Sequence, residues 1–94
     1  MREIRRFHIK LNGRVQGVGF RAFVQKNARV LGLTGWVRNV GYNQIETVAE
    51  GNTEILLRFV EILRAGPPSS HVETIEFDEE PVSNEFDRFT MRFI

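Results

Sequence analysis

The spacing of apolar residues switches several times along this chain of 94 residues between a period of two and a period near 3.6. The first period is typical of a half-buried strand, and the second is typical of a helix with one apolar face. Alternation predicts strands at residues 5–12, 36–40, 45–50, 71–77 and 89–94. Helical spacing predicts one helix over residues 20–33 and another between a cap at Asn52 or Thr53 and the sequence Gly66-Pro67-Pro68.

This order of elements, β-α-β-β-α-β with one further strand, predicts an α+β fold of the ferredoxin-like type. We expect two helices on one face of an antiparallel sheet, right-handed crossovers, and a short extra strand at the C-terminus. The length allows one hydrophobic core rather than two. Because residues 81–87 are the only loosely patterned stretch, we expect residues 1–94 to form a single domain.

Charge is unevenly distributed, although the formal net charge is only +1. Basic side chains dominate residues 1–38, where Glu3 is the one acid, whereas residues 73–87 carry acids and no base. A basic first half favours an anionic partner. The alternative is that the two segments lie side by side and neutralise each other.

The chain has no cysteine, which excludes disulfides, thiolate nucleophiles and sulfur-ligated metals. It also has no apolar run of membrane-spanning length and no signal-peptide pattern. We therefore expect a cytoplasmic protein that has no membrane partner.

Residues 13–21, GRVQGVGFR, join the first expected strand to the first expected helix. Residues 17–22 match G-x-G-x-x-A, but a dinucleotide site needs a larger sheet and an acid about 20 residues further on, and residues 36–42 contain none. An RNA-binding aromatic motif is disfavoured because Phe20 and Phe23 belong to the apolar helix face. The remaining interpretation is a loop whose backbone N–H groups point at one anion at a helix N-terminus.

Arg21 lies in the first turn of this helix, where the macrodipole disfavours a cation. A bound dianion would reverse that penalty, and a guanidinium fork suits two phosphate oxygens. The alternative is a solvated surface arginine. His8 is expected on the polar face of a strand and His71 on the surface, and their spacing is not that of metal ligands. We therefore expect no metal and no other cofactor.

The stretches Gly13–Arg21 and Leu31–Asn39, GRVQGVGFR and LGLTGWVRN, strongly resemble the acylphosphatase family. Further similarity at residues 45–46, 48–51 and 66–69 extends the resemblance over roughly residues 7–94. It implies a metal-free hydrolase of carboxyl-phosphate anhydrides with Arg21 and Asn39 as catalytic residues. In that family the matching asparagine positions the attacking water. The phosphate-binding residues that the resemblance implies are Val15, Gln16, Gly17, Val18, Gly19, Phe20 and Arg21.

The implied reaction suits the residues that this chain contains. An acyl phosphate departs as a carboxylate, whose conjugate acid has a pKa of roughly 4 to 5, so the leaving group needs no proton from a general acid. The sequence offers little acid–base machinery, which agrees with such a reaction. Taken without the resemblance, however, Asn39 is typical of a turn residue at the end of a strand.

The sequence departs from its relatives at two places. Tyr42-Asn43 follow Gly41 where the family often has Asp-Gly, and Ala22 follows Arg21 where a similar module of a hydrogenase-maturation carbamoyltransferase commonly has proline. We expect a free-standing monomeric enzyme that acts on a small acyl phosphate, is inhibited by inorganic phosphate and binds no nucleic acid. The alternatives are a non-catalytic phosphate-recognising or RNA-binding module, or a domain cut from such a carbamoyltransferase.

Overall fold

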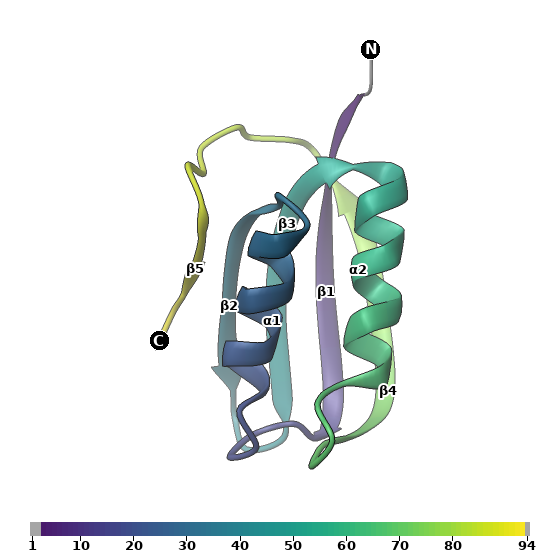
Figure 1. The fold of residues 1–94 in the computed structure, drawn as a ribbon, viewed down its shortest axis with the longest axis vertical. Coiled ribbons are helices and arrows are strands. Elements are labelled where there is room, and N and C mark those ends of the chain that lie inside the picture. Colours follow the sequence, from purple (N-terminus) through teal and green to yellow (C-terminus); the bar gives the residue numbers. More distant parts are fainter. Residues whose placement is uncertain (1–2, 94) are drawn as a thin grey trace.

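The computed structural model describes residues 3–93 and confirms the expected order of elements (Figure 1). Each strand and helix arises where the apolar spacing predicts one. The elements are β1 (Ile4–Arg14), α1 (Phe20–Val30), β2 (Thr34–Val40), β3 (Gln44–Asn52), α2 (Thr53–Ala65), β4 (His71–Glu80) and β5 (Phe89–Met91). No helix among the described residues is long and apolar enough to cross a membrane.

The five strands form one sheet in the order β4-β1-β3-β2-β5. Four of them pair antiparallel, as expected, but β5 pairs parallel with β2, so the complete sheet is mixed. The connection from β4 passes over the end of the sheet at which β2 begins (Figure 1). A chain that crosses at that end must run back along the sheet in the direction of β2.

Several element ends differ from the sequence prediction. The first helix ends at Val30 rather than Leu33, because Gly32 adopts a left-handed conformation with φ 73°. β2 begins at Thr34 instead of residue 36, β3 continues through Asn52, and β4 continues through Glu80. β5 ends at Met91, and Ile94, the last residue of the predicted strand, lies outside the described residues.

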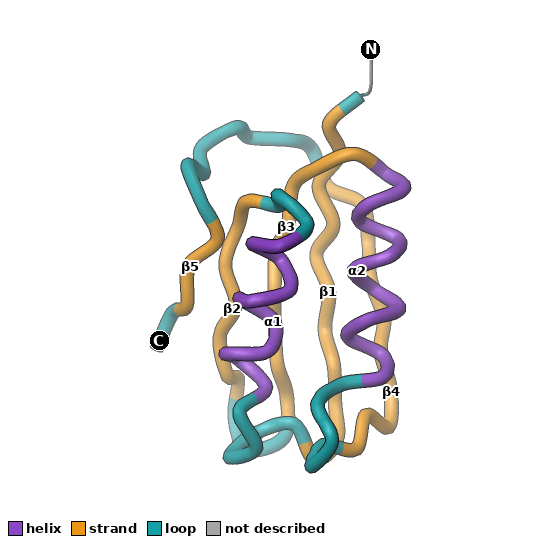
Figure 2. Tube along the Cα trace, viewed as in Figure 1, coloured by secondary structure: helices purple, strands orange, loops and turns teal. Residues whose placement is uncertain are grey.

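Both helices cover the same face of the sheet, and the core lies between them and the strands (Figures 1 and 2). The apolar positions of the first strand, Phe7, Ile9 and Leu11, point into this core. Asn52 caps α2 by accepting a hydrogen bond from the Ile55 N–H at 3.0 Å, one of the two caps expected. The fully buried large side chains include Phe20, Val24, Val37, Ile45, Leu56, Phe59, Leu63 and Phe89.

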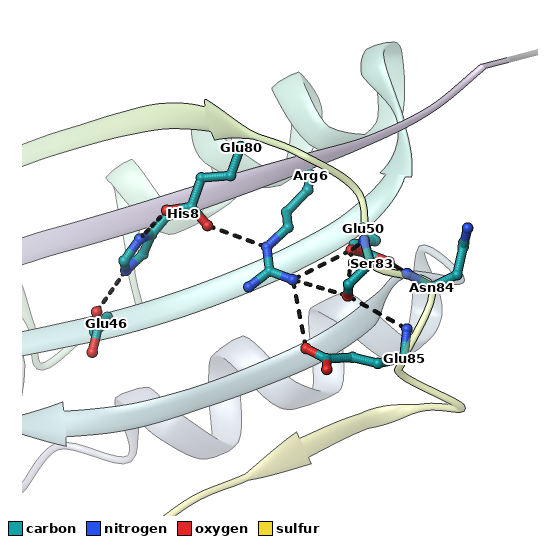
Figure 3. A network of polar contacts seen from close by, with 8 residues as sticks. All are labelled: Arg6, His8, Glu46, Glu50, Glu80, Ser83, Asn84 and Glu85. Carbon is teal, nitrogen blue, oxygen red and sulfur yellow. Dashed lines mark hydrogen bonds and ion pairs between the residues drawn. The ribbon is translucent and has the colours of Figure 1, made fainter.

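The open face of the sheet carries a network of opposite charges across neighbouring strands (Figure 3). On β1, Arg6 pairs with Glu80 of β4, and His8 lies between Glu80 and Glu46 of β3. The basic first segment and the acidic later segment therefore lie side by side, so much of their charge is neutralised within the fold. Glu46, expected to face outward, does so but is only 9% exposed beneath these partners.

Both ring nitrogens of His8 contact carboxylates, Nδ1 to Glu80 at 2.8 Å and Nε2 to Glu46 at 2.5 Å. Burial by itself would raise the pKa of Glu46, but hydrogen bonds from His8 and Arg38 outweigh it and hold that pKa below its ordinary value. The hydrogen bond from His8 likewise lowers the pKa of Glu80.

A second part of this network anchors the connection between β4 and β5 (Figure 3). The buried carboxylate of Glu50 accepts hydrogen bonds from the N–H groups of Ser83 at 2.9 Å and Asn84 at 3.3 Å. Arg6 donates to Ser83 Oγ, and its guanidinium lies 5.4 Å from the centre of the Phe86 ring. These contacts hold residues 81–88 across the end of the sheet and so determine where β5 begins.

Acid should destabilise the protein through this network. Because the folded pKa values of Glu46 and Glu80 are depressed, their stabilisation is complete above the ordinary value of 4.5 and is lost as the pH falls through the lower folded values. We expect Glu46→Gln to cost roughly 1–3 kcal/mol at pH 7, because it weakens charge-assisted hydrogen bonds, and to cost less at pH 3. Urea unfolding at both pH values measures the difference.

The matched control is Glu61→Gln, which breaks an exposed ion pair with Arg64 on the surface of α2. We expect a change within about 0.5 kcal/mol at either pH, because exposed pairs contribute little. Equal pH dependence of stability in Glu46→Gln and the unmodified protein would show that Glu46 does not contribute to acid unfolding.

Candidate active site

A pocket lies at the end of the sheet where β1 and β2 both terminate and α1 begins. β1 and β2 each pair antiparallel with β3, so they run in the same direction and their carboxyl ends lie at the same end of the sheet. The loop after β1 lies there, beside the start of α1 (Figure 2). The lining residues are Val15, Gln16, Gly17, Gly19, Phe20, Arg21, Ala22, Asn39 and Met91.

The cradle loop, residues 15–19, curls into α1 through two left-handed glycines. Gly17 has φ 73° and Gly19, the N-cap of α1, has φ 77°. A Cβ atom at either position would meet nothing within 4 Å, so the requirement for glycine comes from the backbone conformation rather than from crowding.

The backbone amides of residues 16–19 are available to bind an anion. Among residues 3–93, none accepts a hydrogen bond from the N–H groups of residues 16–19. The N–H groups of Phe20 and Arg21 lie in the first helical turn and have no intrahelical acceptor. The loop and the first helical turn therefore offer several unpaired donors at the positive end of the helix dipole, an arrangement that suits phosphate.

Val15 differs from its neighbours in the predicted phosphate-binding set. Its N–H donates to the carbonyl oxygen of Gly13 at 3.0 Å, and its side chain is fully buried. A donor that already closes a local turn is not available to phosphate. Val15 therefore packs the floor of the pocket, and our proposed anion site begins at Gln16.

The side chain of Gln16 ties the cradle loop to the β2–β3 hairpin. Its Nε2 lies 3.3 Å from the carbonyl oxygen of Val40, 3.1 Å from that of Gly41 and 3.0 Å from that of Gln44. The sequence interpretation used only the backbone amide of Gln16, because nothing in local spacing indicates a contact with a distant turn. This side chain sets the separation between the loop and the end of β2.

Asn39 lies at the end of β2 on the face that the helices cover. It pairs in register with Ile45, which pairs with Leu11, and both of those side chains are buried in the core. The Oδ1 atom of Asn39 is buried and has no hydrogen-bond partner among the described residues. An unpartnered buried acceptor at the pocket wall can receive a hydrogen bond from water.

Arg21 lines the pocket from the first turn of α1. Its Nη1 lies 3.4 Å from the carbonyl oxygen of Arg92, and its guanidinium carbon lies 4.7 Å from the centre of the Phe93 ring. The structure thus brings together Arg21, Asn39 and the cradle loop. It also adds Met91 of β5, a pocket residue that the sequence interpretation missed because it depends on which strand β5 joins.

Neither of the two histidines lines this pocket. His8 is held by carboxylates on the open face, and His71 is exposed at the start of β4. Among the described residues, no three histidine, aspartate or glutamate side chains come together in a way that could hold a metal ion.

The fold and the pocket define a small ferredoxin-like α+β protein with a candidate anion site at a helix N-terminus. The family model described as Acylphosphatase matches residues 7–91 of this chain. An acylphosphatase of Syntrophotalea carbinolica is 47% identical over 88 residues, which make up 94% of this chain and 96% of that relative. The chain belongs to the acylphosphatase family.

Solved structures agree with this assignment. An acylphosphatase from Coxiella burnetii superposes with a TM-score of 0.91 at 36% identity, over 95% of this chain and 93% of that one. An acylphosphatase from Bacillus subtilis superposes with a TM-score of 0.90 at 38% identity, over 97% of this chain and all of the other. The likeness therefore extends over the whole fold as well as the loop motifs.

Replacing the side chain that ties the loop to the hairpin tests its structural role. We expect Gln16→Met to lower the free energy of unfolding by about 1–2 kcal/mol, because it removes the donor that the hairpin carbonyls share. It should also weaken phosphate binding, because the loop is no longer held in place. Urea unfolding and calorimetric titration with inorganic phosphate measure the two effects.

Gln25→Met is the matched control, since Gln25 lies in α1 outside the pocket. We expect this variant to bind phosphate as the unmodified protein does. If Gln16→Met also binds phosphate unchanged, the contacts with the hairpin do not organise the anion site.

Proposed function

We propose that this chain hydrolyses the carboxyl-phosphate anhydride bond of acyl phosphates, giving a carboxylate and inorganic phosphate through in-line attack of water. One observation carries the proposal: free loop amides, a guanidinium and an unpartnered amide oxygen line a single pocket. Membership of the acylphosphatase family supports the same reaction.

The phosphoryl group of the substrate occupies the cradle loop. The N–H groups from Gln16 to Phe20 surround it, and the guanidinium of Arg21 donates to two of its oxygens. These fixed donors stabilise charge on the equatorial oxygens as the bond to the carboxylate lengthens. They need little reorganisation during the reaction, because the glycine conformations and the Gln16 contacts already position the loop.

The attacking water is held by Asn39. Its Oδ1 accepts a hydrogen bond from the water and directs the oxygen lone pair at phosphorus, opposite the departing carboxylate. The unpartnered state of this buried atom supports the role, because a buried amide oxygen is ordinarily satisfied by a partner. The carboxylate departs without a proton, so the reaction does not need either histidine.

The proposal extends to the state, location and partners of the protein. Residues 1–94 act as a single, monomeric, cytoplasmic domain whose product, inorganic phosphate, competes with substrate. Nucleic acid is not a partner, because the aromatic residue of the open face, Trp36, is 9% exposed between Arg38 and Arg92. A covered ring of this kind cannot stack on bases.

Incubation with benzoyl phosphate in the presence of EDTA tests the proposed function. We expect rapid release of benzoate and phosphate, together with competitive inhibition by inorganic phosphate, because the cradle recognises a tetrahedral anion. Phosphate binding without turnover would identify a recognition module. Activity that EDTA abolishes and Mg²⁺ or Zn²⁺ restores would contradict the mechanism.

Arg21→Ala should remove both phosphate affinity and turnover, since one forked donor serves the bound substrate and the transition state. Arg21→Lys should be a poor replacement, because it keeps the charge but loses the planar fork. The free energy of unfolding should change little, because a cation near a helix N-terminus alters it by only about 0.3–1 kcal/mol. The measurements are kcat, the phosphate inhibition constant and thermal unfolding. An active Arg21→Ala protein would refute the assignment.

Asn39→Ala should separate catalysis from binding. We expect kcat to fall by orders of magnitude while the phosphate inhibition constant stays nearly unchanged, because the water loses its orientation and the cradle is untouched. Both constants are measured on the same folded variant, checked by circular dichroism. A joint loss of binding and turnover would assign Asn39 to the anion site, and no change in either would leave it a turn residue.

A further inference from the structure

The C-terminal segment after β5 reaches the guanidinium of Arg21. Its contacts there are the carbonyl oxygen of Arg92 at 3.4 Å and the ring of Phe93, whose centre is 4.7 Å from the guanidinium carbon. A cation within about 6 Å of a ring centre is attracted by the ring quadrupole. Arg21 is thus held by residues more than 70 positions further along the chain.

Phe93 is not placed by burial. Its side chain is 77% exposed, so the hydrophobic effect contributes little to its position. The backbone before it is fixed, however, because the Arg92 N–H donates to the carbonyl oxygen of Val37 at 2.8 Å and the Arg92 guanidinium stacks on Trp36 at 4.4 Å. The fixed backbone of Arg92 therefore places the exposed ring of Phe93 against the guanidinium of Arg21.

Both partners that Arg21 has among the described residues are neutral, which suits its position. The amides of the first helical turn repel a cation, so a free guanidinium gains by turning away from the pocket. A carboxylate would hold it there but would compete with a phosphoryl dianion for the same donors. A ring face and a carbonyl oxygen attract the cation while leaving most of its five N–H groups free.

We propose that Phe93 is a positioning residue for the hydrolysis of acyl phosphates. Its ring holds the guanidinium of Arg21 at the pocket wall, so that the donor fork faces the phosphoryl site before substrate arrives. This inference rests on the proposed function and adds to it a residue outside the strands and helices. The ring therefore contributes to the affinity for phosphate and not to the chemical step.

Four substitutions at one position test the proposal by steady-state kinetics with benzoyl phosphate and by phosphate inhibition. For Phe93→Ala we expect KM and the phosphate inhibition constant to rise together by about two- to fivefold, the range of an exposed cation–π contact. The value of kcat should stay within about twofold, because the contact is the same in the ground state and the transition state. Phe93→Tyr and Phe93→Trp should restore affinity, and Phe93→Leu should not.

Phe77→Ala is the matched control. Phe77 is a partly exposed phenylalanine that stacks on Phe7 at 4.8 Å, but it lies on β4 at the far edge of the sheet. We expect it to lower stability and leave KM and the phosphate inhibition constant unchanged. That result would show that lost stability alone does not weaken phosphate binding.

Unchanged KM and phosphate inhibition in Phe93→Ala would overturn the proposal, and so would full affinity in Phe93→Leu, which keeps apolar bulk without a ring. A fall in kcat with unchanged phosphate inhibition would also overturn it. These outcomes are distinct from failure of the proposed function, in which the unmodified protein itself would neither bind phosphate nor hydrolyse benzoyl phosphate.

Discussion

The position of β3 between β1 and β2 is the constraint on which the site depends. Antiparallel pairing on both sides of β3 makes β1 and β2 parallel, so the loop after one and the last residues of the other meet at a single edge. The helix between them must begin at that edge as well. The crossover therefore brings free amides, Arg21 and Asn39 into one pocket.

Charges on the open face support this site from a distance. Glu50 and Arg6 hold the connection between β4 and β5, and the placement of that connection brings Met91 to the pocket and Phe93 to Arg21. His8 bridges two carboxylates in the same network, so its contacts are structural, and it does not line the pocket. In this fold many of the ionisable groups stabilise the scaffold, and backbone amides are the main anion-binding groups that we propose.

Two features of the site are unfavourable for the free protein but suit the proposed chemistry. An arginine at a helix N-terminus and a buried amide oxygen without a partner are each unfavourable in the free protein. In the proposed reaction, a phosphoryl dianion compensates the first and a bound water compensates the second. Because the leaving group is a carboxylate, this electrostatic arrangement is sufficient without a proton donor.

The sequence by itself determined the elements and their faces, because the period of apolar residues reports backbone geometry and the side that is buried. The motifs around Arg21 and Asn39 also indicated the family. Tertiary structure alone decided that β5 runs parallel to β2 and that Gln16 and Phe93 reach partners far along the chain. Such contacts join residues as many as 77 positions apart, as Arg6 and Ser83 are, and they depend on strand order and chain crossing, which local spacing does not encode.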